Sequence, residues 1–237
     1  MNKRSAIYIL DGMGPQAGGY LYNMLINKAT GEYGARNNDD FPEIILHLVP
    51  VPDFISDDRS RDEALEMLKK RVEEAKKLNI SCLSIACNTA HIFLDQLQEV
   101  SKSPFISIVS EVVSSVTQSK VKKVGIIGTP SALRYKIYQT ALKERGIESV
   151  IPIKSQISIL EKIIRNVLKG KNNKGDQKQL ISIANSLKKQ GAQAIILGCT
   201  ELPLVFPSNY HLPVYNSVEI LAYALLRKYY GGNTIRA

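Results

Sequence analysis

Short apolar runs rich in β-branched residues recur along the chain, each bounded by turn-forming residues. Such runs predict β-strands, which we place at about residues 5–10, 43–49, 80–86, 105–109, 123–128, 194–198 and 213–215. Between the runs, apolar residues return at helical spacing, which predicts helices at 61–78, 131–145, 157–169, 176–190 and 217–229. Alternating strands and helices indicate an α/β fold, with parallel sheets covered by helices on both faces.

The two halves of the chain resemble each other. The first opens with a strand, a glycine turn and a helix start over residues 7–15, and the second opens in the same way over residues 124–131. Each half then ends in a strand followed by a cysteine, Cys87 or Cys199. This repeat predicts two pseudo-symmetric parallel-sheet domains. Because ligands bind at the carboxyl ends of parallel strands, we expect the active site in the cleft between the domains.

Polar residues mark the boundary between the halves, where Ser115, Thr117, Gln118 and Ser119 interrupt the apolar pattern. We therefore assign residues 1–114 and 213–237 to the first domain, which carries Cys87, and expect the last helix to return to it. Residues 115–212 form the second domain, which carries Cys199.

Composition and charge limit the classes of binding partner that we expect for this chain. The chain has 237 residues and a formal net charge of +9, but its lysines are spread over helices and loops. This spread is typical of a solvated surface and predicts no nucleic-acid partner. No apolar run is long enough to cross a membrane, and the N-terminus leads into a strand instead of a signal-peptide core. We expect a soluble, cytoplasmic protein without a membrane partner, whose three cysteines remain thiols.

Cys87 and Cys199 are the candidate catalytic residues because each closes an apolar strand and opens a polar turn. A thiol acts as a base only when ionised, and a free cysteine has a pKa of about 8.5. Unpaired amides at a helix start lower that pKa, and we expect the turns after both cysteines to supply them. Two such thiols on opposite sides of a cleft could invert a carbon centre. Cys82 lies inside a strand, where we expect a core residue.

Three motifs together resemble the aspartate/glutamate racemase family, within the Asp/Glu/hydantoin racemase superfamily, and aspartate racemase-like proteins most closely. They are Gly12-Met13-Gly14-Pro15, Cys87-Asn88-Thr89-Ala90-His91 and Gly198-Cys199-Thr200-Glu201. The resemblance covers residues 5–229. It implies a homodimeric amino-acid racemase without cofactor, pyridoxal phosphate or metal, in which Cys87 and Cys199 serve opposite faces of the substrate α-carbon as base and acid.

The resemblance also implies the substrate-binding residues. Asn88, Thr89 and Thr200 would bind the substrate carboxylate and ammonium groups, and Met13 would line the pocket. Glu201 would orient the second site or cap its helix. Asp11 stands where the family usually has glycine, and its carboxylate would either hold the substrate ammonium or cap the turn.

The expected substrate is a small acidic amino acid, with aspartate favoured and glutamate as the alternative. Many aspartate racemases carry an Asp-Arg pair after the second strand, and Arg59 is the candidate here, although a solvated position at the start of the 61–78 helix explains it better. A lysine expected from the second domain has no clear match, since Lys154 and Lys162 flank its place. The reaction is therefore better specified than the substrate.

Other functions remain open at this point. A related fold supports isomerisation of other small carboxylates, such as maleate or hydantoins, whereas two cysteines argue against a one-cysteine decarboxylase. A catalytically silent amino-acid-binding protein would keep the cleft without turnover. A redox sensor would need both thiols within disulfide reach.

Overall fold

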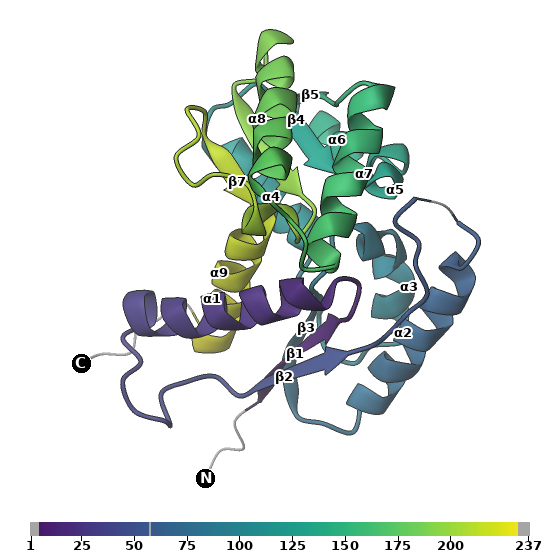
Figure 1. The fold of residues 1–237 in the computed structure, drawn as a ribbon. Helices are drawn as coiled ribbons and strands as arrows, with labels where there is room; N and C mark the ends of the chain where they lie inside the picture. Colours follow the sequence, from purple (N-terminus) through teal and green to yellow (C-terminus); the bar gives the residue numbers. More distant parts are fainter. Residues whose placement is uncertain (1–4, 57, 232–237) are drawn as a thin grey trace.

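The computed structural model describes residues 5–56 and 58–231, and its strands form two parallel β-sheets (Figure 1). The first sheet has the order β2-β1-β3, and its strands are β1 (Ala6–Asp11), β2 (Ile44–Leu48) and β3 (Ile80–Ile85). The second has the order β5-β4-β6-β7, and its strands are β4 (Lys123–Gly128), β5 (Glu148–Val150), β6 (Ala194–Gly198) and β7 (Val214–Asn216). The predicted α/β class with two parallel-sheet units is confirmed.

Helices flank both sheets. Those of the first half are α1 (Pro15–Tyr33), α2 (Arg61–Ala75), the 3-10 helix η1 (Thr89–Phe93), α3 (Leu94–Glu99) and α4 (Ile108–Gln118). Those that follow are α5 (Pro130–Arg134), α6 (Ile137–Glu144), α7 (Lys154–Leu168), α8 (Lys174–Lys189), the 3-10 helix η2 (Leu202–Leu204) and α9 (Ser217–Tyr230). No helix in the described ranges has the length and apolar character needed to span a bilayer.

A shared apolar core joins the two sheets. Ile9 of β1 and Ile126 of β4 belong to one buried cluster, together with Val112 of α4 and Leu221 of α9. Helices α4 and α9 pack against each other, and α9 also packs on α1 (Figure 1). This common core fixes the relative position of the two sheets, whose carboxyl ends carry the glycine turns and the two candidate cysteines.

The segment after residue 212 contributes to both halves. Strand β7 pairs with β6 in the second sheet, with Ile196 opposite Tyr215, whereas α9 packs on α1 of the first half. The domain limits derived from the sequence stay a prediction, and the chain crosses between the two sheets close to Ser217.

One predicted strand is wrong. Residues 105–109 form a single bridge, Phe105 to Leu83, and α4 begins at Ile108. Ser107 caps this helix by accepting a hydrogen bond from the amide of Ser110, and Ile108, Val109 and Val112 then follow helical spacing. The β-branched residues here fill a helix face, because burial outweighs their strand propensity.

Two other elements differ from the prediction. The helix expected over 131–145 is divided into α5 and α6 at Lys136, whose φ of 56° is left-handed. The short strand β5 has no sequence prediction, because three residues at a sheet edge are too few to show a period.

Candidate active site

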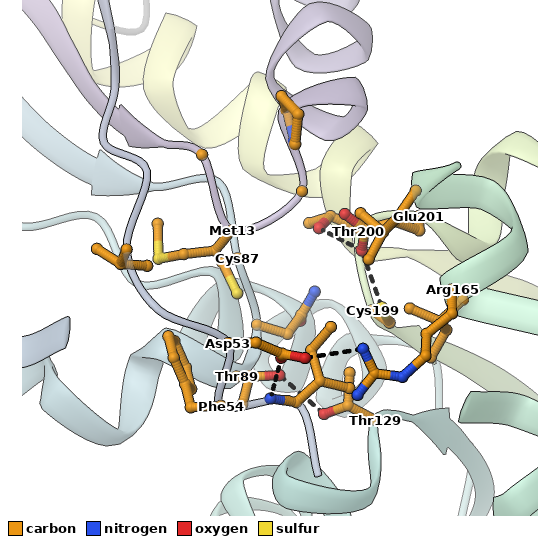
Figure 2. A pocket seen from close by; sticks show the side chains of 18 of the residues that line it. Met13, Asp53, Phe54, Cys87, Thr89, Thr129, Arg165, Cys199, Thr200 and Glu201 are labelled. Carbon is orange, nitrogen blue, oxygen red and sulfur yellow. Dashed lines mark hydrogen bonds and ion pairs between the residues drawn. The ribbon is translucent and has the colours of Figure 1, made fainter. Parts of the chain in front are cut away.

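A cavity of about 320 Å³ lies between the two domains (Figure 2). Of the residues predicted from the sequence, it brings together Met13, Cys87, Asn88, Thr89, Cys199, Thr200 and Glu201. Both cysteine-containing turns and the first glycine turn therefore meet at one place, as expected for the carboxyl ends of parallel strands.

The two cysteines come from different sheets. Cys87 lies just after β3 and Cys199 just after β6, and their side chains line the cavity from opposite sides (Figure 2). Both residues are buried, with 6% and 4% of their surface exposed, and all three cysteines of the chain are free thiols. A small molecule in this cavity would therefore have a thiol on either side.

Cys199 has a built-in partner for its proton. Its Sγ lies 2.9 Å from Oε2 of Glu201, as a hydrogen-bond donor. Oε2 also accepts a hydrogen bond of 3.1 Å from the hydroxyl of Thr200. Burial raises the pKa of Glu201 to about 7, against the opposing effect of these hydrogen bonds. This carboxyl is therefore suited to exchange a proton near neutral pH.

The second oxygen of Glu201 faces the first glycine turn. A Cβ built on Gly14 would lie 1.7 Å from Oε1, so the missing side chain of Gly14 makes room for this carboxylate. Oε1 is buried and has no hydrogen-bond partner within the described residues. Since an unpaired buried oxygen is costly, this atom is available to a donor from a bound molecule.

The expectation of thiols with lowered pKa values is wrong for this cavity. Burial raises the pKa of Cys87 to about 12, and the negative charge of Glu201 adds to the increase. Burial also raises the pKa of Cys199 well above its ordinary value, and the negative charge of Glu201 raises it further. The amides of Thr89 and Ala90 lower the pKa of Cys87, as predicted, but less than burial raises it.

Polar side chains join the two halves beside Cys87. The hydroxyls of Thr89 and Thr129 lie 2.8 Å apart, and both residues line the cavity. Asn88 donates a 3.1 Å hydrogen bond to Ser217 and accepts one from the Tyr138 hydroxyl, so its side chain is already held in place. Thr129 is missing from the sequence-derived site, although the repeat of the glycine turn at residues 128–131 points to it.

Asp11 lies outside the cavity lining. Its carboxyl packs on the first turn of α1, where a Cβ on Gly18 would lie 2.0 Å from Oδ2. Burial raises the pKa of Asp11 to about 6, and hydrogen bonds from the amides of Gly12 and Gly18 act in the opposite direction. Of the two roles predicted for this carboxylate, these contacts favour capping the turn.

His91 holds a neutral ring beside the first thiol. Its Nε2 accepts a 3.0 Å hydrogen bond from the amide of Ile108, so Nδ1 carries the proton and donates to the carbonyl of Cys87 at 2.8 Å. Burial lowers the pKa of His91 to about 4, partly offset by the hydrogen bond to Cys87. His91 therefore ties the Cys87 turn to the start of α4 without exchanging a proton with the thiol.

This pairing predicts acid sensitivity. Because the folded protein binds this proton less readily than the unfolded chain, the contribution of His91 to stability is complete above a pH of about 6.5. It is lost as the pH falls towards 4, by up to about 3 kcal/mol. We expect His91→Gln to be less stable at pH 7 and to lose less stability on acidification, as measured by urea unfolding at both pH values. Parallel losses in the two proteins would contradict this assignment.

Arg165 is a cavity residue that the sequence analysis missed. It lies near the C-terminus of α7, after Lys154 and Lys162, the two lysines considered in the sequence analysis. It lines the cavity together with Ile164 and Leu168. Its Nη1 forms a 2.7 Å ion pair with Oδ2 of Asp53, from the loop after β2 (Figure 2). Arg59, the sequence candidate, is exposed and does not line the cavity.

The cavity has no grouping typical of a metal centre. Within the described ranges, no three His, Cys, Asp or Glu side chains come together as metal ligands. The residues present can form hydrogen bonds through Thr89, Thr129 and Thr200 and transfer protons through the two thiols and the Glu201 carboxyl, while the second carboxylate of the lining, Asp53, is paired with Arg165.

Comparison with known proteins agrees with this geometry. The chain matches the model of the Asp/Glu/hydantoin racemase family over residues 10–225. It is 26% identical to the broad specificity amino-acid racemase RacX of Bacillus subtilis (strain 168), over 94% of this chain and 97% of the relative.

Solved structures share the fold. The aspartate racemase of Picrophilus torridus superposes with a TM-score of 0.80 at 26% identity, over 95% of this chain and 94% of that one. An aspartate racemase homologue from Pyrococcus horikoshii OT3 gives a TM-score of 0.80 at 24% identity, over 95% and 99% of the two chains.

Fold, cavity and comparisons define an isomerase of the class that acts on amino acids without pyridoxal phosphate. The chain belongs to the Asp/Glu/hydantoin racemase family and is an amino-acid racemase.

Proposed function

We propose that this racemase uses Cys87 and Cys199 as two bases on opposite faces of the substrate α-carbon. The observation that carries the proposal is the single cavity lined by one thiol from each sheet. Binding in a small cavity between two acid-base groups places both close to the reacting carbon, which favours proton transfer.

The proton balance is simple. In one direction the Cys87 thiolate removes the α-proton and becomes a thiol, while the Cys199 thiol protonates the carbanion-like carbon from the other face and becomes a thiolate. In the other direction the roles exchange. Before the next turnover in the same direction, Cys199 regains a proton through Glu201, whose Oε2 already accepts the hydrogen bond from Sγ, and Cys87 releases its proton to solvent.

Substrate binding would supply the positive charge that the thiols need. Both pKa values are raised by burial and by Glu201. A substrate ammonium near the thiols lowers the pKa of each, because an opposite charge favours the ionised form. Oε1 of Glu201 is buried and without a partner in the described residues, and is our candidate acceptor for this ammonium.

The substrate carboxylate would then lie on the hydroxyl side of the cavity, near Thr89, Thr129 and Thr200. Asn88 orients this region through its hydrogen bonds. An acidic amino acid, aspartate or glutamate, stays the substrate prediction. Arg165 is the cation that could bind the side-chain carboxylate of such a substrate. The contacts that Arg165 already makes within the protein therefore affect which substrates the cavity accepts.

Chiral chromatography tests this function. Purified protein should convert either enantiomer of a substrate into the racemate without added pyridoxal phosphate or metal, in a panel of aspartate, glutamate and their amides. Binding of these amino acids without interconversion would instead support a silent binding protein.

We also propose that the protein is a homodimer that uses the free edge of the first sheet. Strand β2 lies at this edge, and Leu46 and Leu48 point to the same face, with 38% and 51% of their surface exposed. Exposed apolar side chains on an unpaired edge strand are typical of an association surface.

A charge at this edge should weaken the dimer. We expect Leu48→Lys to shift the protein towards monomer in light scattering coupled to gel filtration, because a buried lysine at an interface costs desolvation. Ile153→Lys, on the second domain and 61% exposed, is the matched control and should leave the mass unchanged. A wild-type protein that is monomeric at all concentrations would contradict the proposal.

A further inference from the structure

The end of the cavity that we assign to the substrate side chain contains a cation, Arg165, that already has a partner at each guanidinium nitrogen. Nε of Arg165 donates to Glu161 at 2.9 Å, Nη1 donates to Asp53 at 2.7 Å and Nη2 donates to Ser56 at 3.2 Å. Each guanidinium nitrogen thus has a partner, and two of the partners are carboxylates. Among the described residues that line the cavity, Arg165 is the one cationic side chain.

A hydrogen bond within its own loop holds the Asp53 carboxylate in its position beside Arg165. Its Oδ1 accepts a 2.9 Å hydrogen bond from the amide of Ile55, which leaves Oδ2 for the guanidinium. This local turn holds the carboxylate in place on the loop after β2, independently of any contact with the second domain.

The same loop is fastened to the second domain by further hydrogen bonds. The carbonyl of Ile55 accepts from the amide of Ser131 at 3.0 Å, and the carbonyl of Ser56 accepts from Arg134 at 2.9 Å. Arg134 also pairs with Asp58 at 2.7 Å. The Asp53 carboxylate is therefore placed by the fold and is not a freely moving surface group.

The other side chains that this loop and α7 contribute to the cavity are mainly apolar. Val51, Phe54 and Ile55 line the cavity from the loop, and Ile164 and Leu168 line it from α7. A substrate carboxylate would have to displace Asp53 from Arg165 or share the guanidinium with it, and in either case it would gain less than from an unpaired arginine. An uncharged side chain would leave the pair intact and contact these apolar side chains.

We infer that Asp53 determines the side-chain specificity of this racemase by occupying Arg165, so that the cavity accepts uncharged side chains as well as acidic ones. The inference rests on the proposed function and assigns its substrate class. Because the pair is partly exposed, with 51% of the Asp53 side chain accessible, displacement by an acidic substrate has a limited cost. Acidic and uncharged substrates then differ little in the wild-type protein.

Aspartate and asparagine provide the test, since they differ mainly in side-chain charge. We expect the wild-type protein to racemise both, with kcat/KM values within about tenfold of each other. Asp53→Asn keeps an oxygen for the amide of Ile55 but removes the charge. It should free Arg165 and raise the aspartate-to-asparagine ratio of kcat/KM by at least about fivefold.

Asp58→Asn is the matched control. It makes the same change on the same loop, and it removes a second ion pair of this loop, with Arg134, without altering the cavity lining. Its ratio should equal that of the wild-type protein.

Two results would overturn the inference: a wild-type preference for aspartate above about tenfold, or an unchanged ratio in Asp53→Asn. Racemisation of neither these two substrates nor any other amino acid would instead contradict the proposed function, so the two failures are distinguishable.

Discussion

Replacing either Cys87 or Cys199 with alanine should lower kcat for racemisation by at least about a thousandfold. Each variant keeps one thiol, but a single thiol serves a single face of the α-carbon. The loss should appear mainly in kcat, because the hydroxyls of Thr89, Thr129 and Thr200, which we assign to substrate binding, remain in place. Steady-state kinetics in both directions measures the effect.

Cys82→Ala is the control for this experiment. Cys82 is as buried as the catalytic candidates but lies in the apolar core beside β1, away from the cavity. Its replacement should leave kcat within about threefold of the wild-type value, since it alters packing alone. If Cys87→Ala or Cys199→Ala behaved like Cys82→Ala, the assignment of that cysteine would fail.

Gly12→Ala should strongly destabilise the fold, by about 2–4 kcal/mol. An added Cβ would lie 2.3 Å from the carbonyl oxygen of Val49 and 2.8 Å from its nitrogen, and backbone atoms cannot move aside cheaply. The φ of 104° at Gly12 is also one that residues with a Cβ rarely adopt. Thermal unfolding of the purified variant would show the loss.

Gly19→Ala is the matched control for this prediction. Gly19 lies in α1, and among the described residues no atom outside the local helix backbone would come within 4 Å of an added Cβ. Alanine there should be neutral or slightly stabilising, because it raises helix propensity. Equal stability of Gly12→Ala and Gly19→Ala would show that the close approach to Val49 has no energetic consequence.

The sequence predicts most of the central strands and the meeting of the two cysteines. Both follow from short-range patterns, since β1, β3, β4 and β6 are rich in apolar residues and Cys87 and Cys199 follow the corresponding strands, β3 and β6, of the two repeats. The parallel arrangement then brings the strand ends together. The apolar run at residues 105–109 misleads because Ser107 starts a helix there, and this depends on a cap that apolar periodicity does not reveal.

The end of the cavity that contains Arg165 and Asp53 is harder to predict from the sequence. Arg165 is one of many cations on amphipathic helices, and its place beside Ile164 and Leu168 depends on how α7 packs against the loop after β2. Asp53 is distant in sequence from its partner, at 112 positions, and no local pattern joins the two. The thiol pKa values also depend on burial in three dimensions, which outweighs the local effect of the turn amides.

The two-base mechanism can be tested most directly by the fate of the α-hydrogen in heavy water. Purified protein is incubated with one enantiomer of its substrate, and early samples are separated into both enantiomers and analysed for deuterium by mass spectrometry. Two thiols on opposite faces predict that the newly formed enantiomer carries deuterium while the remaining substrate keeps its hydrogen. Equal labelling of both enantiomers from the earliest times would indicate a single base that serves both faces, and would contradict the assignment of separate roles to Cys87 and Cys199.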